Sequence, residues 1–65
     1  MKNNMKLFRV MKNLSQRQLG DLAGCSQQEI SAIENGEVVP TVYIALCIAR
    51  VLERNVEDLF ILEGG

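Results

Sequence analysis

The sequence predicts an all-α domain of five short helices, two of which form a helix-turn-helix. Apolar residues recur at the spacing of one helix face through most of the chain. Residues that cap helix N-termini precede these stretches, and one connection is only about three residues long and contains glycine. No strand, internal repeat or low-complexity stretch is evident. A chain of 65 residues holds one domain, expected to span residues 1–65.

The limits of the helices follow from the residues at their ends. The helices are expected at about residues 4–12, 16–23, 27–35, 41–53 and 56–60. Asn13 tolerates the left-handed conformation and is expected to end the first helix. Ser15 and Gln18 have the spacing of a capping box at the start of the second helix, which Gly24 ends. The expected buried stripe of the second helix is Leu19, Leu22 and Ala23.

A short turn after Gly24 joins the second and third helices. Ser26 and Glu29 have the spacing of another capping box, so the third helix begins directly after this turn. Two helices so close together cannot be collinear, and a short turn with glycine is typical of a helix-turn-helix. Asn35-Gly36 is expected to end the third helix, and Thr41 to cap the fourth. The expected buried stripe of the fourth helix is Val42, Ala45, Leu46, Ile48, Ala49 and Leu52.

Composition excludes several classes of function. The chain has no His, so the acid–base and metal chemistry of imidazole is absent. Cys25 and Cys47 have no further soft ligand with which to build a zinc site. A nucleophile–base pair and a phosphate-binding loop are also lacking, so we expect no enzyme, no cofactor and no metal. The longest apolar run, residues 42–49, is too short for the roughly 18 residues of a membrane span. We therefore expect a cytoplasmic protein with no membrane partner.

Charge is unevenly distributed along the chain. The net charge is −1, but residues 1–17 contain five basic residues and no acidic ones. Residues 18–65 contain two basic residues against eight acidic ones. Because salt screens charges beyond about 8–10 Å, the local sign matters more than the total. The basic segment fits an anionic partner, although a solvated basic helix remains the alternative.

The predicted third helix has an outward side without acidic residues. Ile30 and Ile33 define its buried side. The opposite side carries Gln28, Ser31, Ala32 and Asn35. Amide side chains in the first turn, Gln27 and Gln28, can meet both hydrogen-bonding groups of an adenine edge in the major groove. Small residues allow the helix to approach the bases closely, and helix N-termini offer N–H groups to phosphates. That both glutamines are only solvated surface remains the alternative.

The sequence resembles a known family of DNA-binding domains. The matching residues are Leu14-Ser15-Gln16, Leu19, Gly24, Ser26, Ile30, Ser31, Ile33-Glu34-Asn35-Gly36, Pro40, Leu46, Ile48 and Ala49. They resemble the helix-turn-helix domain of the lambdoid phage repressor and Cro family, also called the Xre family, over about residues 5–60. The resemblance implies a five-helix domain that binds double-stranded DNA in the major groove and regulates transcription, usually as a homodimer.

The resemblance also implies roles for single residues. Gln16 corresponds to a phosphate contact, Gln27 and Gln28 to base-reading positions, and Asn35 to a contact with the DNA backbone. With the helical pattern, the expected DNA-binding residues are Gln16, Arg17, Ser26, Gln27, Gln28, Ser31, Ala32 and Asn35. Arg9 and Glu34 match a pair that relatives use as an internal salt bridge. Relatives usually carry Lys or Arg just after Asn-Gly, whereas this chain has Glu37-Val38-Val39, so non-specific affinity should be weak.

Apolar residues near the C-terminus exceed what a small core needs. The expected dimer interface comprises Val51, Phe60, Ile61 and Leu62. A two-fold dimer places two reading helices about 34 Å apart, which predicts an inverted-repeat operator. The alternative is that Phe60 and Leu62 close the core of a monomer.

These observations favour a homodimeric transcription regulator, with repression as the expected action. The main alternative is a protein-binding adaptor or antitoxin with the same fold. The net acidity, the Glu37-Val38-Val39 loop and the apolar C-terminal residues favour that alternative. The acid-free outward side of the third helix opposes it.

Overall fold

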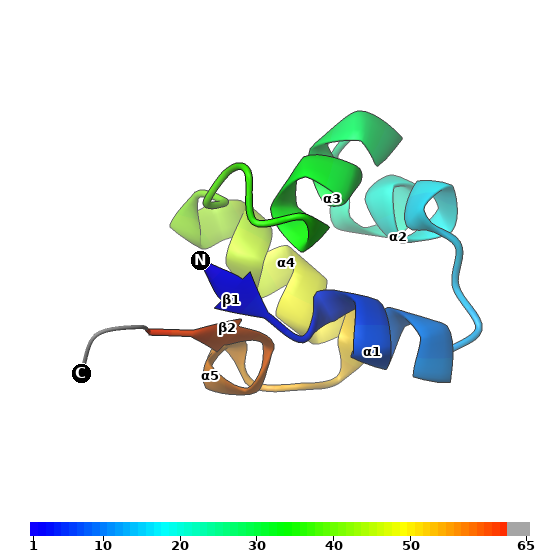
Figure 1. Ribbon diagram of the computed structural model, residues 1–65. Coiled ribbons are helices and arrows are strands. Elements are labelled where there is room, and N and C mark those ends of the chain that lie inside the picture. Colours follow the sequence, from blue (N-terminus) through cyan, green and yellow to red (C-terminus); the bar gives the residue numbers. More distant parts are fainter. Residues whose placement is uncertain (63–65) are drawn as a thin grey trace.

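The protein is a bundle of short helices closed by a minimal sheet, as a computed structural model that describes residues 1–62 shows (Figure 1). The helices of the described part are α1 (Met5–Met11), α2 (Gln16–Ala23), α3 (Gln27–Glu34), α4 (Val42–Leu52) and α5 (Val56–Leu59). The strands are β1 (Lys2–Asn3) and β2 (Phe60–Ile61). The predicted fold class is therefore confirmed, with the sheet as a minor addition.

Local capping residues set most helix limits, as the sequence predicted. The Ser15 hydroxyl accepts from the Gln18 N–H at 3.0 Å, and the Gln18 side chain accepts from the Ser15 N–H at 2.8 Å. Asn13 and Gly24 take positive φ values of 58° and 82° after α1 and α2. Ser26 also caps α3, but among residues 1–62 only its hydroxyl bond to the Glu29 N–H is made, without the reciprocal side-chain bond.

The small sheet corrects the expectation that the chain has no strand. β1 pairs with β2 in antiparallel register, Lys2 opposite Ile61 and Asn3 opposite Phe60. The Asn4 N–H extends the pairing with a 2.7 Å bond to the Leu59 carbonyl. Strands of two residues are too short to show the alternating pattern by which a strand is recognised. Phe60 thus belongs to β2 and not to the last helix, and the first residues lie beside the end of the described chain.

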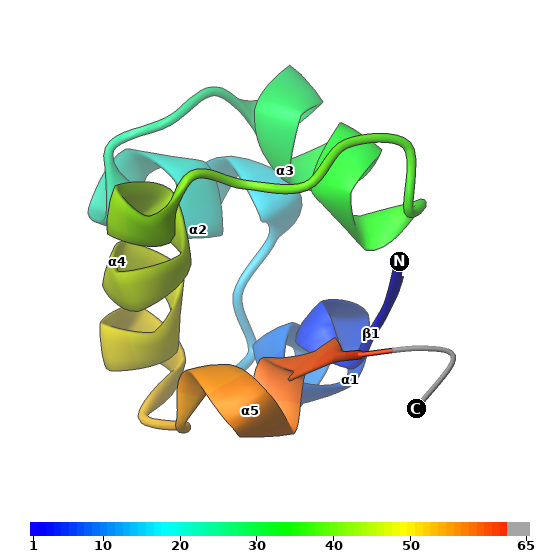
Figure 2. The same ribbon diagram turned by 90° about the vertical axis from the view of Figure 1, so that its left-hand side faces the viewer.

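The core lies where the helices face one another. In Figure 2, α2 and α3 lie above, α4 runs down one side, and α1 and α5 lie below. The buried apolar cluster is Met5, Leu19, Ala23, Ile30, Ile33, Ile48, Ala49, Leu52 and Leu59. It draws on all five helices, so no helix of the described chain packs alone.

Three residues expected in buried stripes are exposed. Leu22 of α2 is 62% exposed, and Val42 and Leu46 of α4 are 77% and 56% exposed. Helical spacing identifies an apolar face but does not show how far the neighbouring helices cover it. Ala45, Ile48, Ala49 and Leu52 form the buried part of α4.

The turn of the helix-turn-helix depends on Gly20 as well as Gly24. A Cβ added at Gly20 would lie 2.7 Å from the Cys25 carbonyl oxygen and 3.2 Å from the Ser26 carbonyl carbon. The absence of a side chain therefore lets α2 pass directly against the start of α3. This close approach fixes the angle at which α3 leaves the body of the molecule.

Candidate nucleic-acid interface

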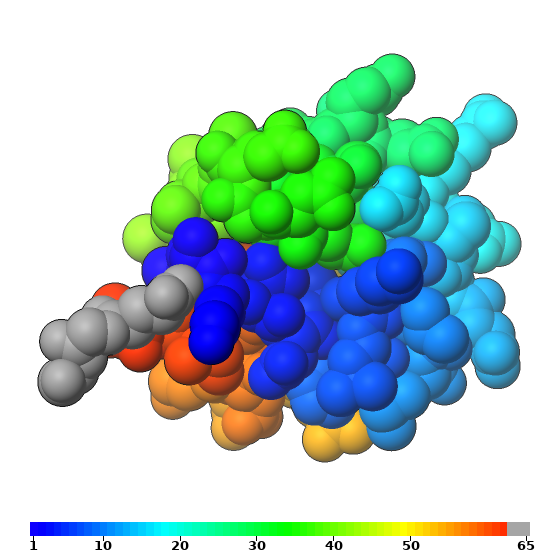
Figure 3. Space-filling view, viewed as in Figure 1, coloured from blue at the N-terminus to red at the C-terminus, as the bar shows by residue number. Residues whose placement is uncertain are grey.

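α3 exposes one side along the upper edge of the molecule in Figure 1. Gln27 and Gln28 are exposed, Ser31 and Ala32 are half-buried, and Ile30 is buried against the core. In the space-filling view, the residues of α3 and the following loop form an upper surface that α2 continues at one end (Figure 3). α3 thus turns its exposed glutamines and half-buried small residues away from the core.

These residues line one side of an open hollow. Its lining comprises Gln16, Gln27, Gln28, Ser31, Ala32 and Glu37. We call this set the reading face. It combines the first residue of α2, the outward side of α3 and the first residue of the loop beyond Gly36. The structure therefore brings together five residues expected to bind DNA, and adds Glu37.

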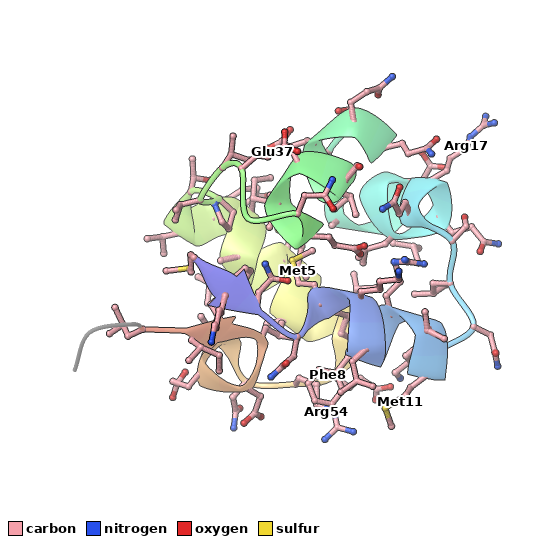
Figure 4. The ribbon with its side chains drawn as sticks, in the orientation of Figure 1. Met5, Phe8, Met11, Arg17, Glu37 and Arg54 are labelled. Carbon is pink, nitrogen blue, oxygen red and sulfur yellow. The ribbon has the colours of Figure 1, made fainter. Side chains whose placement is uncertain are left out.

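The N-termini of α2 and α3 both lie at the reading face, which includes their first residues, Gln16 and Gln27. The first N–H groups of a helix have no partner within it, and they attract phosphate oxygens. The Ser26 hydroxyl is already engaged with the Glu29 N–H at 3.0 Å. Arg17, in the first turn of α2, is exposed, and its guanidinium projects away from the body of the molecule in Figure 4.

An ion pair behind the reading face holds α3 to α1. Arg9 Nε donates to Glu34 Oε2 at 2.7 Å, and Arg9 Nη2 donates to Glu34 Oε1 at 3.3 Å. Arg9 Nη1 also donates to the Leu14 carbonyl at 2.8 Å. The two side chains are 10% and 4% exposed. The negative charge of Glu34 is therefore neutralised inside the molecule and does not face the outward side of α3.

Gln16 connects this ion pair with the reading face. Its Nε2 donates to Glu34 Oε1 at 3.1 Å, and the side chain is half-buried. An amide nitrogen has two N–H groups, so the second remains to reach a phosphate. The bond to Glu34 holds the amide in place at the edge of the hollow.

Asn35 and Glu37 lie together where α3 ends. Asn35 is exposed, and its Nδ2 donates to Glu37 Oε2 at a long 3.5 Å. From the sequence, Glu37 was expected to weaken non-specific affinity and to favour the adaptor or antitoxin alternative, but not to join the DNA-binding residues. The signal for its place on the reading face lies in Asn35-Gly36, because a left-handed glycine after a helix turns the chain back toward the preceding turn.

Other basic residues contribute unequally to the charge near this region. Lys12 pairs with Glu53, at the far ends of α1 and α4. Lys6 is exposed on α1. Arg54 lies over the Phe8 ring at 4.4 Å from its centroid (Figure 4). Arg17 follows Gln16 directly in the chain and is exposed, so it places a positive charge next to the reading face.

The residues expected at a dimer interface occupy different environments. Val51 and Phe60 are half-buried and pack against the core, whereas Ile61 and Leu62 are exposed. A separate apolar groove of about 350 Å³ runs between the start of α4 and α5. Its lining comprises Met1, Val39, Pro40, Val42, Ala45, Leu46, Val56, Glu57 and Phe60. Val39, Val42 and Leu46 were not among the expected interface residues.

The cysteines form no disulfide within the described residues. Cys25 and Cys47 are both half-buried free thiols. Burial raises the pKa of the Cys25 thiol, and the charges of Glu29 and Cys47 raise this pKa further.

Residues 1–62 contain no cluster of His, Cys, Asp and Glu able to hold a metal ion. No helix in this part of the chain has the length and apolarity to cross a membrane.

A short turn joins α2 to the exposed helix α3, which is the arrangement of the helix-turn-helix motif found in DNA-binding domains. The helix-turn-helix family HTH_3 matches residues 5–59, and the chain belongs to this family, in agreement with the Xre resemblance. The chain is 40% identical to the uncharacterised HTH-type transcriptional regulator YgzD of Bacillus subtilis, over 97% of this chain and 96% of that protein. It is 41% identical to the regulator MJ0272 of Methanocaldococcus jannaschii, over the same shares.

Solved structures agree with this assignment. The restriction-modification controller protein C.AhdI of Aeromonas hydrophila superposes with a TM-score of 0.81 at 26% identity, over 88% of this chain and 86% of that one. PlcR of Bacillus thuringiensis, solved with the peptide PapR7 and DNA, gives a TM-score of 0.80 at 33% identity. That match covers 92% of this chain and 22% of PlcR. The chain is therefore a DNA-binding, HTH-type transcriptional regulator.

Proposed function

We propose that this regulator represses transcription by binding an inverted-repeat operator as a homodimer, with α3 in the major groove. The observation that carries the proposal is the outward side of α3. Its glutamines are exposed, its small residues Ser31 and Ala32 line the same hollow, and its last acid, Glu34, is neutralised by Arg9. An operator that overlaps a promoter would then be closed to transcription while the dimer occupies it.

Base recognition is assigned to the first two turns of α3. An exposed Gln side chain can donate to N7 and accept from N6 of one adenine. Gln27 and Gln28 therefore each select one base pair. Ser31 and Ala32 allow a close approach, and the Ala32 methyl can contact a thymine methyl.

Phosphate contacts are assigned to residues around α3. Gln16 has a second amide N–H that is free to reach a phosphate beside the hollow. Arg17, in the first turn of α2, and Asn35, directly after α3, are both exposed. Such contacts position the protein on the duplex without reading sequence. Ser26 belongs to this group through its place at the N-terminus of α3, although its hydroxyl is used in the helix cap.

The dimer is assigned to the apolar groove and the adjoining C-terminal residues. Val42 and Leu46 are exposed along one side of α4, and Leu62 beyond β2 is 87% exposed. Phe60 lines the groove, so the groove continues the interface expected at Phe60, Ile61 and Leu62. Val51 faces the core, so its contribution to the dimer is small. A second copy of the chain, related by a two-fold axis, covers the groove on both molecules.

A binding selection from random duplexes at low salt tests the proposed function. The wild-type protein is expected to enrich a pseudo-palindrome. Gln27→Ala and Gln28→Ala should each relax one position of each half-site, by about 1–3 kcal/mol. Arg50→Ala, an exposed change on α4 outside the reading face, is the control and should leave the motif unchanged.

Two results would overturn the proposal. Equal weakening at every position in the glutamine variants would show that these side chains do not read bases. Co-purification of a stoichiometric protein partner, with no salt-sensitive DNA binding, would instead indicate an adaptor or antitoxin.

A further inference from the structure

Glu37 is fixed to the end of α3 by the backbone. Gly36 has a φ of 77° and its N–H donates to the Ile33 carbonyl at 3.0 Å. The Glu37 N–H donates to the Ala32 carbonyl at 2.9 Å. These two bonds form a Schellman motif, which holds the second residue after the helix cap against its last turn. Glu37 is therefore a rigid extension of α3.

The Glu37 carboxylate shares a hollow with the residues that face the bases. It lines the hollow together with Gln28, Ser31 and Ala32. Figure 4 shows its side chain on the same upper edge of the molecule as that side of α3. Glu37 takes no part in the ion pairs of Arg9 with Glu34 and of Lys12 with Glu53 within residues 1–62. Its bond from Asn35, at 3.5 Å, is long.

An ionised carboxylate can only accept hydrogen bonds. In the major groove, cytosine presents an N4 amino donor with no acceptor on the same base edge, whereas adenine presents its N6 donor beside the acceptor N7. Guanine presents the acceptors O6 and N7, and thymine presents the acceptor O4. A carboxylate held against the groove gains a charge-assisted hydrogen bond from cytosine and is repelled by acceptors. Phosphate also repels it, so Glu37 serves poorly as a backbone contact.

We propose that Glu37 is a base-reading residue that selects cytosine at the operator position next to those read from Gln28 and Ala32. The inference rests on the proposed function, because it requires α3 in the major groove. Relatives usually carry a basic residue at this position, directly after Asn35-Gly36, which adds affinity for DNA of any sequence. Glu37 gives up that affinity and supplies selectivity for one base pair. The loss of affinity and the gain in specificity have the same cause.

A comparison of selected motifs for the wild type, Glu37→Gln and Glu29→Gln tests the inference. Each variant removes one negative charge: Glu29 lies in the first turn of α3, and Glu37 lies just beyond its end. Glu37 lines the hollow, whereas Glu29 does not. The wild type should prefer cytosine at one position of each half-site by about five- to tenfold. Glu37→Gln should abolish that preference and bind the remaining sequences more tightly. Glu29→Gln should keep the preference for cytosine.

The outcomes separate this inference from the proposed function. If the wild type enriches a pseudo-palindrome but Glu37→Gln strengthens binding to all sequences equally, Glu37 only repels phosphate and the inference is wrong. The inference is also wrong if Glu29→Gln changes the same base position. If the wild type enriches no motif, the proposed function itself fails and the inference fails with it.

Discussion

Removal of Glu34 should destabilise the fold more than any surface charge change. The Glu34 side chain is 4% exposed and binds two guanidinium nitrogens of Arg9 and the amide of Gln16. Glu34→Ala leaves the buried Arg9 charge without its partner, which costs about 3–5 kcal/mol. A chain of this length has a total stability of about 3–10 kcal/mol. The variant should therefore lose a large part of its free energy of unfolding.

Urea unfolding followed by circular dichroism measures this effect, with an excluded osmolyte in all samples to keep the variant folded in the baseline. Lys12→Ala is the control, because Lys12 and Glu53 are 37% and 73% exposed and such pairs contribute at most about 1 kcal/mol. The double variant Arg9→Met with Glu34→Leu should be more stable than Glu34→Ala, because it leaves no unpaired charge. A loss below about 1 kcal/mol in Glu34→Ala would refute the reasoning, since that is the size of an exposed pair.

Three further predictions follow from the packing and the groove. Gly20→Ala should lower the free energy of unfolding by about 1–3 kcal/mol, and with it the midpoint of thermal unfolding, because the new Cβ meets the Cys25 carbonyl oxygen at 2.7 Å. A raised midpoint would contradict the close approach. The raised pKa of the Cys25 thiol means that the folded state holds this proton more tightly than the unfolded chain. The thiol proton contributes fully to stability below about pH 8.5, and this contribution is lost as the pH rises through the folded pKa. Over that range, the free energy of unfolding measured in urea should fall for the wild type relative to Cys25→Ala. Leu46→Glu should convert the proposed dimer to a monomer in sedimentation velocity, whereas Leu22→Glu, similarly exposed but outside the groove, should not. A dimer that persists in Leu46→Glu would exclude the groove as the interface.

The helix limits were predictable because they depend on residues close together in the chain. The Ser15 cap, the left-handed Asn13 and the left-handed Gly24 need only their immediate neighbours. The buried Ile30 and Ile33 of α3 were predictable for a related reason, since a helix of eight residues has one clear apolar side. The same pattern identified which side of α3 faces outward.

Features that depend on distant segments were not predictable. The exposure of Leu22, Val42 and Leu46 depends on where the neighbouring helices end, which helical spacing does not report. The pairing of β1 with β2 joins the two ends of the described chain through only two residues each. Glu37 was missed as a member of the reading face because its place follows from the backbone bonds around Gly36, although its unusual charge was visible.

The most direct test of the central claim is the amide spectrum of the ¹⁵N-labelled full chain, titrated with a duplex that carries the selected motif. The largest shift changes should fall on residues 16–17 and 26–32, with further changes at Glu37. Groove residues 39–46 should change little once the dimer is formed. Shift changes concentrated in residues 39–46, with the amides of α3 unaffected, would contradict the assignment of α3 as the DNA-reading helix.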